Sequence, residues 1–213
     1  GRWFESSNAH LRQARISLDK PFKKFCMPLD IGIGIFSAII AGKIFSTELT
    51  PLLIGLGIAF ALLPDIDFVY SLLKNGHRNL KAIATHRDLI HYPLIYLPAG
   101  ALLAWLLDSQ WSMLFLLASI GHFLHDSIGI GWGIPWLWPF SDANYTFLYR
   151  YSPPGKRLPR KLIYRWERKQ LDELIERYGD PEWFYNIYVR LHPFFLVEIL
   201  FFVAASVVLW RII

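Results

Sequence analysis

A chain of 213 residues that is 54% hydrophobic, with a mean hydropathy of +0.32, is more apolar than most soluble domains of its length. Its single cysteine, Cys26, excludes an internal disulfide framework. A net charge of +5 could indicate a nucleic-acid partner, but the position of the basic residues explains it better, so no nucleic acid is expected.

Apolar segments recur along the chain, each bounded by polar or turn-forming residues. They comprise residues 29–46, 51–64, 92–107, 111–125 and 193–213. About 20 apolar residues are enough for a helix to cross a bilayer. The links after the first and third segments are short, which favours antiparallel neighbouring helices. The sequence therefore predicts an all-α fold, a polytopic membrane helical bundle with about five spans.

Twenty of the 22 Lys and Arg residues lie in three polar segments, residues 1–28, 65–91 and 141–192. Basic residues that flank membrane spans favour the cytoplasm. Five spans with a cytoplasmic N-terminus would place all three segments on that side. The chain is therefore expected to cross a membrane several times, with these three segments in the cytoplasm.

The third basic segment contains a stretch with helical periodicity, residues 160–178. Apolar side chains such as Trp166 and Leu174 share a broad face, and most basic side chains lie opposite or beside it. This pattern predicts a cytoplasmic amphipathic helix. Such a helix could lie on the bilayer surface or pack on its own domain.

Residues 121–126, at the end of the fourth apolar segment, contain three ionisable groups close together. His122, His125 and Asp126 are spaced i, i+3 and i+4, so a helix would present them on one face. Imidazole and carboxylate groups one turn apart can bind a divalent metal ion. The alternative is that they lie at a hydrated membrane interface and bind nothing.

Two further clusters fall at the same predicted depth. Asp65 and Asp67 end the second span, and His86 and His91 precede the third. Each cluster has an ordinary alternative: the two Asp residues could cap helices, and the two His residues, at i and i+5, share a helical face poorly. Convergence of the three clusters on one side of the membrane favours a common site.

Three motifs carry a resemblance to a known family. They are Leu62-Leu63-Pro64-Asp65-Ile66-Asp67, His86-Arg87-Asp88-Leu89-Ile90-His91, and His122-Phe123-Leu124-His125-Asp126 followed by Trp138-Pro139-Phe140. In this order they resemble the membrane-bound metal-dependent hydrolases, which include the LexA-binding, inner-membrane-associated hydrolases of bacteria. That family has Pro-Asp-x-Asp, then His-Arg-Gly-x-Thr-His-Ser, then His-x-x-x-Asp. The resemblance covers residues 30–140, and it implies that the expected location is the cell inner membrane, with a multi-pass chain.

The resemblance implies a set of metal-site residues and one extra group. The implied metal residues are Asp65, Asp67, His86, His91, His122 and Asp126, and His125 is then an additional group, a candidate proton carrier. The first motif departs from the family pattern, because Phe68 stands where a His often follows the second Asp. If that His is a ligand in relatives, this chain binds one metal ion rather than two, or has lost activity.

The domain organisation follows from spans, charges and motifs together. It comprises a basic cytoplasmic N-terminal segment (1–28), a membrane-embedded metal-site domain with four spans (29–140), a basic cytoplasmic segment with a surface helix (141–192) and a last span (193–213).

The primary functional prediction is a metal-dependent hydrolase that opens to the cytoplasmic membrane surface and uses metal-activated water. One or two Zn, Mn or Fe ions suit a mixed His and carboxylate shell. Arg87 would stabilise negative charge on a phosphoryl oxygen, and His125 or Asp88 would act as general acid or base. Membrane lipids would surround the site, and an amphiphilic phosphorylated substrate, such as a lipid-linked or prenyl-linked phosphoester, is expected.

Two alternatives from other classes remain. One is a metal-holding membrane scaffold that binds a protein partner through residues 141–192 and catalyses nothing. The other is a proton or ion pathway, in which Asp30 and Glu198 extend the polar cluster inward. The pathway ranks last, because the outer halves of the spans contain no continuous series of polar residues beyond Lys43 along which an ion could move.

Overall fold

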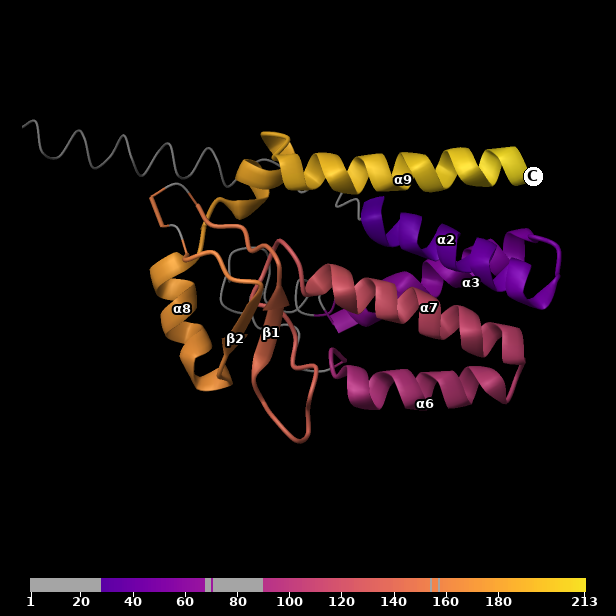
Figure 1. The fold of residues 1–213 in the computed structure, drawn as a ribbon, viewed down its shortest axis with the longest axis horizontal. Coiled ribbons are helices and arrows are strands. Elements are labelled where there is room, and N and C mark those ends of the chain that lie inside the picture. Colours follow the sequence, from indigo (N-terminus) through magenta and orange to yellow (C-terminus); the bar gives the residue numbers. More distant parts are fainter. Residues whose placement is uncertain (1–27, 68–69, 71–89, 154, 157) are drawn as a thin grey trace, which may run out of the picture.

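A computed structural model describes residues 28–67, 70, 90–153, 155–156 and 158–213. Long helices lie side by side, and a smaller lobe of strands and short helices covers one end of them (Figure 1). The long helices are α2 (Pro28–Phe45), α3 (Pro51–Leu62), α6 (Pro93–Trp105), α7 (Ser109–Asp126) and α9 (Pro193–Ile212). The protein is therefore mostly helical, as the apolar segments predict.

Short polar links define where two of these helices begin. Thr50 precedes α3, and its hydroxyl accepts a hydrogen bond from the backbone N–H of Leu53 at 3.2 Å. Asp108 precedes α7, and its carboxylate accepts one from the N–H of Gln110 at 2.6 Å. Such caps pair backbone donors that the first helical turn leaves without partners. The caps explain why α3 and α7 begin directly after the short links at which the chain reverses.

Helix α2 packs against α3, α7 and α9. Its contact with α3 is unusually close, because a Cβ atom at Gly57 would collide with the carbonyl oxygen of Gly34. Small residues at an interface allow helix backbones to touch in this way. The same principle applies where α2 meets α7, since a Cβ atom at Gly121 would approach Ile33 Cγ2 to 2.6 Å. Glycines therefore determine how near the polar residues of these helices can come.

By length and composition, two helices among the described residues could cross a membrane. These are α2, with 18 residues, and α9, with 20 residues. The apolar helices Pro51–Asp65 and Pro93–Trp105 are shorter, and α7 has the length but carries more polar residues. Side chains on the outside of α9, including Leu200 and Trp210, are exposed in the isolated protein, as lipid-facing residues would be. Five membrane crossings remain a prediction.

The lobe contains a two-stranded antiparallel sheet that a purely helical fold class does not include. Strand β1 (Asn144–Phe147) pairs with β2 (Ile163–Trp166), with Phe147 opposite Ile163. After the sheet come η3 (Arg168–Gln170), α8 (Leu171–Tyr178) and the π-helical turn η4 (Tyr185–Val189).

The predicted amphipathic helix over 160–178 is therefore wrong in its first half. Residues 163–166 alternate between outward and inward side chains, and pairing with β1 satisfies their backbone groups. Glu167 and Gln170 then form a reciprocal capping box, which starts the helical stretch at this point. Only its second half, formed by η3 and α8, is helical as predicted.

Candidate metal centre

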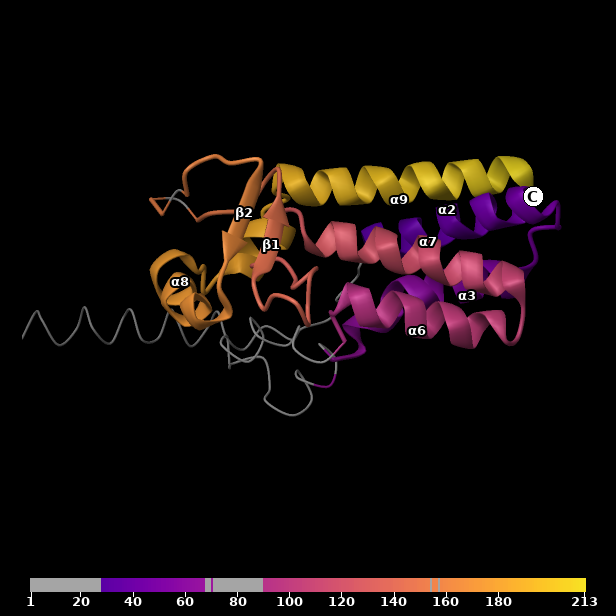
Figure 2. The same ribbon diagram turned by 60° about the horizontal axis from the view of Figure 1, so that its bottom comes forward.

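Ends of helices that are distant in the sequence meet beside the lobe (Figures 1 and 2). The residues at this junction are Asp30 in the first turn of α2, Asp65 after α3, His91 before α6, His122, His125 and Asp126 in the last turns of α7, and Glu198 near the start of α9. Because successive helices run in opposite directions, the start of one lies next to the end of the one before it.

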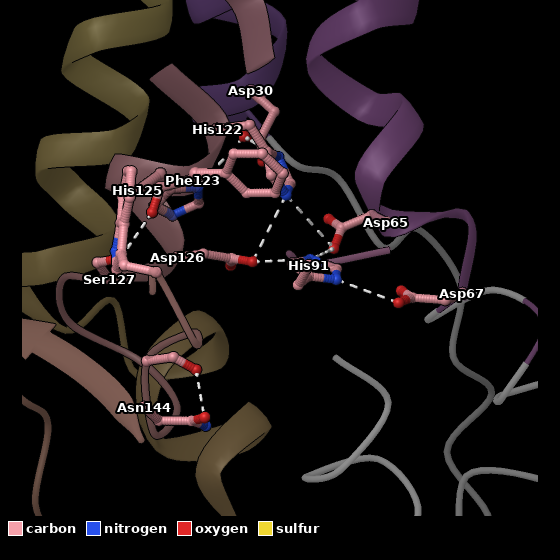
Figure 3. A network of polar contacts seen from close by, with 12 residues as sticks. Asp30, Asp65, Asp67, His91, His122, Phe123, His125, Asp126, Ser127 and Asn144 are labelled. Atoms are coloured by element: carbon pink, nitrogen blue, oxygen red, sulfur yellow. Dashed lines mark hydrogen bonds and ion pairs between the residues drawn. The ribbon is translucent and has the colours of Figure 1, made fainter. Parts of the chain in front are cut away.

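Four of these residues form a group that could hold one metal ion. Asp65, His91, His122 and Asp126 each offer one ligand atom, and all four atoms lie within 4.8 Å of one another. The His91 Nε2 atom lies 2.9 Å from an oxygen of Asp126, and His122 Nε2 lies 3.5 Å from the same oxygen. Both Nε2 atoms lie 3.8 Å from Oδ1 of Asp65 (Figure 3).

The geometry around His122 tests whether this group suits a cation. Its Nε2 atom is buried and has no hydrogen-bond partner among the described residues. The 3.5 and 3.8 Å separations from the carboxylate oxygens are too long for hydrogen bonds. Ligand atoms bound tetrahedrally at ~2.1 Å from one ion lie ~3.4 Å apart. The surroundings of the His122 Nε2 atom therefore fit a divalent ion better than a hydrogen bond, whereas the 2.9 Å between His91 Nε2 and Asp126 allows a hydrogen bond in the metal-free protein.

Each imidazole of the group also has a carboxylate on its other nitrogen. His91 Nδ1 lies 3.1 Å from Asp67, and His122 Nδ1 lies 3.0 Å from Asp30. With Nδ1–H donating to these carboxylates, both Nε2 atoms are left as lone-pair donors directed at Asp65 and Asp126. Carboxylates commonly orient metal-binding histidines in this way. Asp67, which the resemblance implies as a metal residue, thus lies behind His91 and outside the group of four.

The charge balance of the junction is consistent with a cation. Carboxylates outnumber imidazoles by five to three among the described residues at this junction: Asp30, Asp65, Asp67, Asp126 and Glu198 against His91, His122 and His125. Burial by itself lowers the pKa of His91, but hydrogen bonds to Asp126 and Asp67 outweigh this effect and raise the pKa above its ordinary value. A proton on Nε2 of His91 would therefore compete with a metal ion for the same position.

His125 faces away from the group of four. Its Nδ1 lies 3.2 Å from Asp30, its Nε2 lies 3.5 Å from Glu198, and its ring stacks on Phe194 at the start of α9. Asp30 thus contacts two histidines of α7 at once (Figure 3). The acid–base role of His125 stays a prediction, and contacts with Asp30 and Glu198 hold its ring in place.

Several predicted site residues lie outside the described residues. They are His86, Arg87 and Asp88, together with Phe68 of the first motif. Asp30 and Glu198 are absent from the predicted site residues, although Glu198 is also expected to support the site or to face a hydrated crevice; both contact histidines of α7. The clue in the sequence is that each of these two residues is the one acidic residue of its apolar segment, 29–46 or 193–213. A charge inside such a segment is costly unless it has a partner.

Comparisons with known proteins agree on a membrane location. Residues 30–176 match the family described as YdjM inner membrane protein. A relative is the Inner membrane protein YbcI of Escherichia coli (strain K12), which is 31% identical over 128 residues. That alignment covers 56% of this chain and 66% of the relative, so the chain spans just under two thirds of that protein. No solved structure matches the chain.

Proposed function

The chain belongs to the YdjM inner membrane protein family, and on that premise we propose that it is a membrane-embedded, metal-dependent hydrolase. The observation that supports this most directly is the group Asp65, His91, His122 and Asp126, in which the buried His122 Nε2 faces carboxylates at 3.5 and 3.8 Å. A divalent ion bound there would supply Lewis acidity and lower the pKa of a water molecule toward neutrality.

The remaining residues would prepare the site for that chemistry. Asp30 and Asp67 would hold the rings of His122 and His91 so that their Nε2 lone pairs converge. Asp65 is the most accessible of the four ligands, with 12% of its side chain exposed against 8% for Asp126 and none for the two histidines. Substrate would therefore approach from the Asp65 side.

We propose a lipid-linked or other phosphoester as the substrate class. The site lies at the end of the helices rather than midway along them, at the level where a bilayer would present headgroups. Zn, Mn or Fe would suit the mixed His and carboxylate ligands. Arg87 would contact a phosphoryl oxygen and Asp88 or His125 would transfer a proton, as the sequence motifs predict.

Metal analysis of the purified full chain tests the first step of this proposal. We expect about one equivalent of a divalent metal, since one group of four ligands would hold a single ion. His122→Ala and Asp65→Ala should lose it, whereas His192→Gln and Asp142→Ala, which alter the same residue types away from the site, should keep it. If the purified wild type contains no metal and binds none when a divalent metal is added back, the proposal is overturned.

A substrate screen separates the enzyme from the alternative of a metal-holding scaffold. Hydrolysis of lipid phosphates by the wild type, lost in His122→Ala and retained in His192→Gln, would support the enzyme. Full metal occupancy without hydrolysis of any phosphoester would favour the scaffold, because a structural site is coordinatively closed.

We further propose five membrane crossings with a cytoplasmic N-terminus. The alternation of helix directions and the three basic segments support this topology. Reporter fusions at residues 47, 108 and 156 test it. Residue 156 should lie in the cytoplasm and the other two outside, and the opposite assignment of any one of them would contradict the topology.

A further inference from the structure

One end of the two-stranded sheet presents large apolar side chains to the outside. Leu148, Leu162 and Ile163 have exposed fractions of 65%, 76% and 59%. They lie together, because Phe147 pairs with Ile163 and the backbone N–H of Leu148 donates to the carbonyl oxygen of Leu162 at 2.7 Å. An exposed apolar cluster of this kind commonly marks a surface that contacts a partner or a membrane.

The backbone at Leu148 is strained in the conformation that exposes its side chain. Its φ angle is +59°, in the left-handed region that branched, bulky residues rarely adopt. Such strain persists only where surrounding contacts hold it, and it is common at sites of function. The conformation directs a leucine outward at a place where glycine would fit more easily.

Exposed basic residues adjoin this apolar cluster along the chain. Arg160, Lys161 and Arg165 are exposed, and Arg165 shares the outward face of β2 with Ile163. The opposite face of the strand carries Tyr164, which is buried and stacks on Trp166. The outward face is therefore apolar and cationic at once, as expected for a segment that lies in the headgroup layer of an anionic membrane.

The cluster is continuous with the start of a candidate membrane span. Tyr149, next to Leu148, stacks on Phe194 with ring centroids 6.1 Å apart, and the rings of Tyr151 and His192 meet edge to face with centroids 5.4 Å apart. Phe194 lies in the first turn of α9. In both ribbon views the end of β1 is directed toward the start of α9, and α8 lies on the far side of the lobe (Figures 1 and 2).

We propose that this strand-end patch, formed by Leu148, Leu162 and Ile163 with Arg160, Lys161 and Arg165, docks the lobe on the anionic lipid surface around α9. The apolar side chains enter the headgroup layer, and the basic side chains contact lipid phosphates. Docking fixes the lobe over the helix ends that it covers. This proposal depends on the membrane location of the family and not on metal binding or hydrolysis.

A spin label placed at the patch tests the docking in the full chain. Cys26→Ser removes the natural cysteine, and Leu162→Cys then carries a nitroxide, with Glu176→Cys on α8 as the matched control. Collision rates with oxygen and with a water-soluble nickel chelate report membrane depth in nanodiscs of phosphatidylcholine alone or with phosphatidylglycerol. With phosphatidylglycerol present, we expect the ratio of the oxygen collision rate to the nickel collision rate to be severalfold higher for the label at 162 than for the label at 176.

Charge variants separate lipid binding from other causes of protection. Replacing Arg160, Lys161 and Arg165 with Gln should return the label at 162 to the aqueous values, whereas the same change at Lys156, Lys169 and Arg177 should not. Equal nickel access at 162 and 176 would overturn the proposal, as would equal protection in both lipids. Protection that depends on protein concentration in detergent would overturn it in favour of a second copy of the chain.

Discussion

The Nδ1 atom of His122 lies 3.0 Å from Oδ1 of Asp30, although 92 residues separate them. Asp30 is 1% exposed and His122 is fully buried, so neither exchanges this contact for water. The contact joins the first turn of α2 to the last turns of α7. It orients the ring whose other nitrogen faces Asp65 and Asp126.

Asp30→Asn should weaken metal binding without removing a ligand. An amide is a poorer acceptor for Nδ1–H than a carboxylate, and loss of such an orienting partner commonly costs about tenfold to a hundredfold in metal affinity. Asp67→Asn should act similarly through His91. Competition with a fluorescent zinc chelator measures the metal affinity of both variants, and Asp142→Asn is the control. Unchanged affinity in both site variants would show that these carboxylates do not orient the ligands.

Gly121→Val should push α7 away from α2 and disturb the site without altering a polar residue. A Cβ atom at this position would approach Ile33 Cγ2 to 2.6 Å. Overpacking of this kind costs about 1–3 kcal/mol. Thermal unfolding in detergent should show the loss, together with weaker metal binding. Gly55→Val is the matched control, because a Cβ atom there meets nothing within 4 Å; equal effects of the two would contradict this account.

Metal binding should release protons, and affinity should rise with pH. Hydrogen bonds to Asp126 and Asp67 raise the pKa of His91 in the metal-free protein, and a metal ligand must be neutral. Below that raised pKa a metal ion competes with a proton. The same shift stabilises the metal-free fold below the unfolded pKa of about 6.5, and this contribution disappears as pH rises through the folded pKa.

Titration calorimetry of metal binding in two buffers with different protonation enthalpies measures the proton release. The apparent enthalpy should differ between the buffers in proportion to the protons released. His192→Gln, away from the group of four, should leave this number unchanged. Identical enthalpies in both buffers would show that the metal does not displace a proton.

Arg150→Lys should destabilise the lobe and leave the metal group intact. The Arg150 guanidinium lies 3.4 Å from the centre of the Trp132 ring, and it donates to the carbonyl oxygens of Gly131 and Tyr151. Lysine cannot reproduce the stacking and both hydrogen bonds, and each lost buried bond costs about 1–3 kcal/mol. Limited proteolysis should cut the variant lobe faster. Arg177→Lys, at an exposed position of α8, should behave as the wild type. Equal cleavage of both variants would contradict the prediction.

Sequence alone was sufficient to predict the mostly helical architecture, because runs of apolar residues bounded by Thr50-Pro51 or Asp108 leave few alternatives to helices. It also predicted that three polar clusters share one end of the molecule. That inference needs only the alternation of helix directions, which short links such as the one between α6 and α7 enforce. The arrangement of Asp65, His91, His122 and Asp126 follows from it.

Tertiary structure decided what local patterns could not. Asp67 and Asp65 are two residues apart, and only the position of the His91 ring determines that one carboxylate faces each of its nitrogens. In the sequence, residues 163–166 belong to the helical periodicity of residues 160–178. They nevertheless form a strand, because β1, sixteen or more residues earlier, supplies the hydrogen-bond partners. Asp30 and Glu198 become part of the site only because α2 packs against both α7 and α9, which brings Glu198 of α9 to His125 of α7. The spacing of residues within one segment does not reveal such contacts between distant segments.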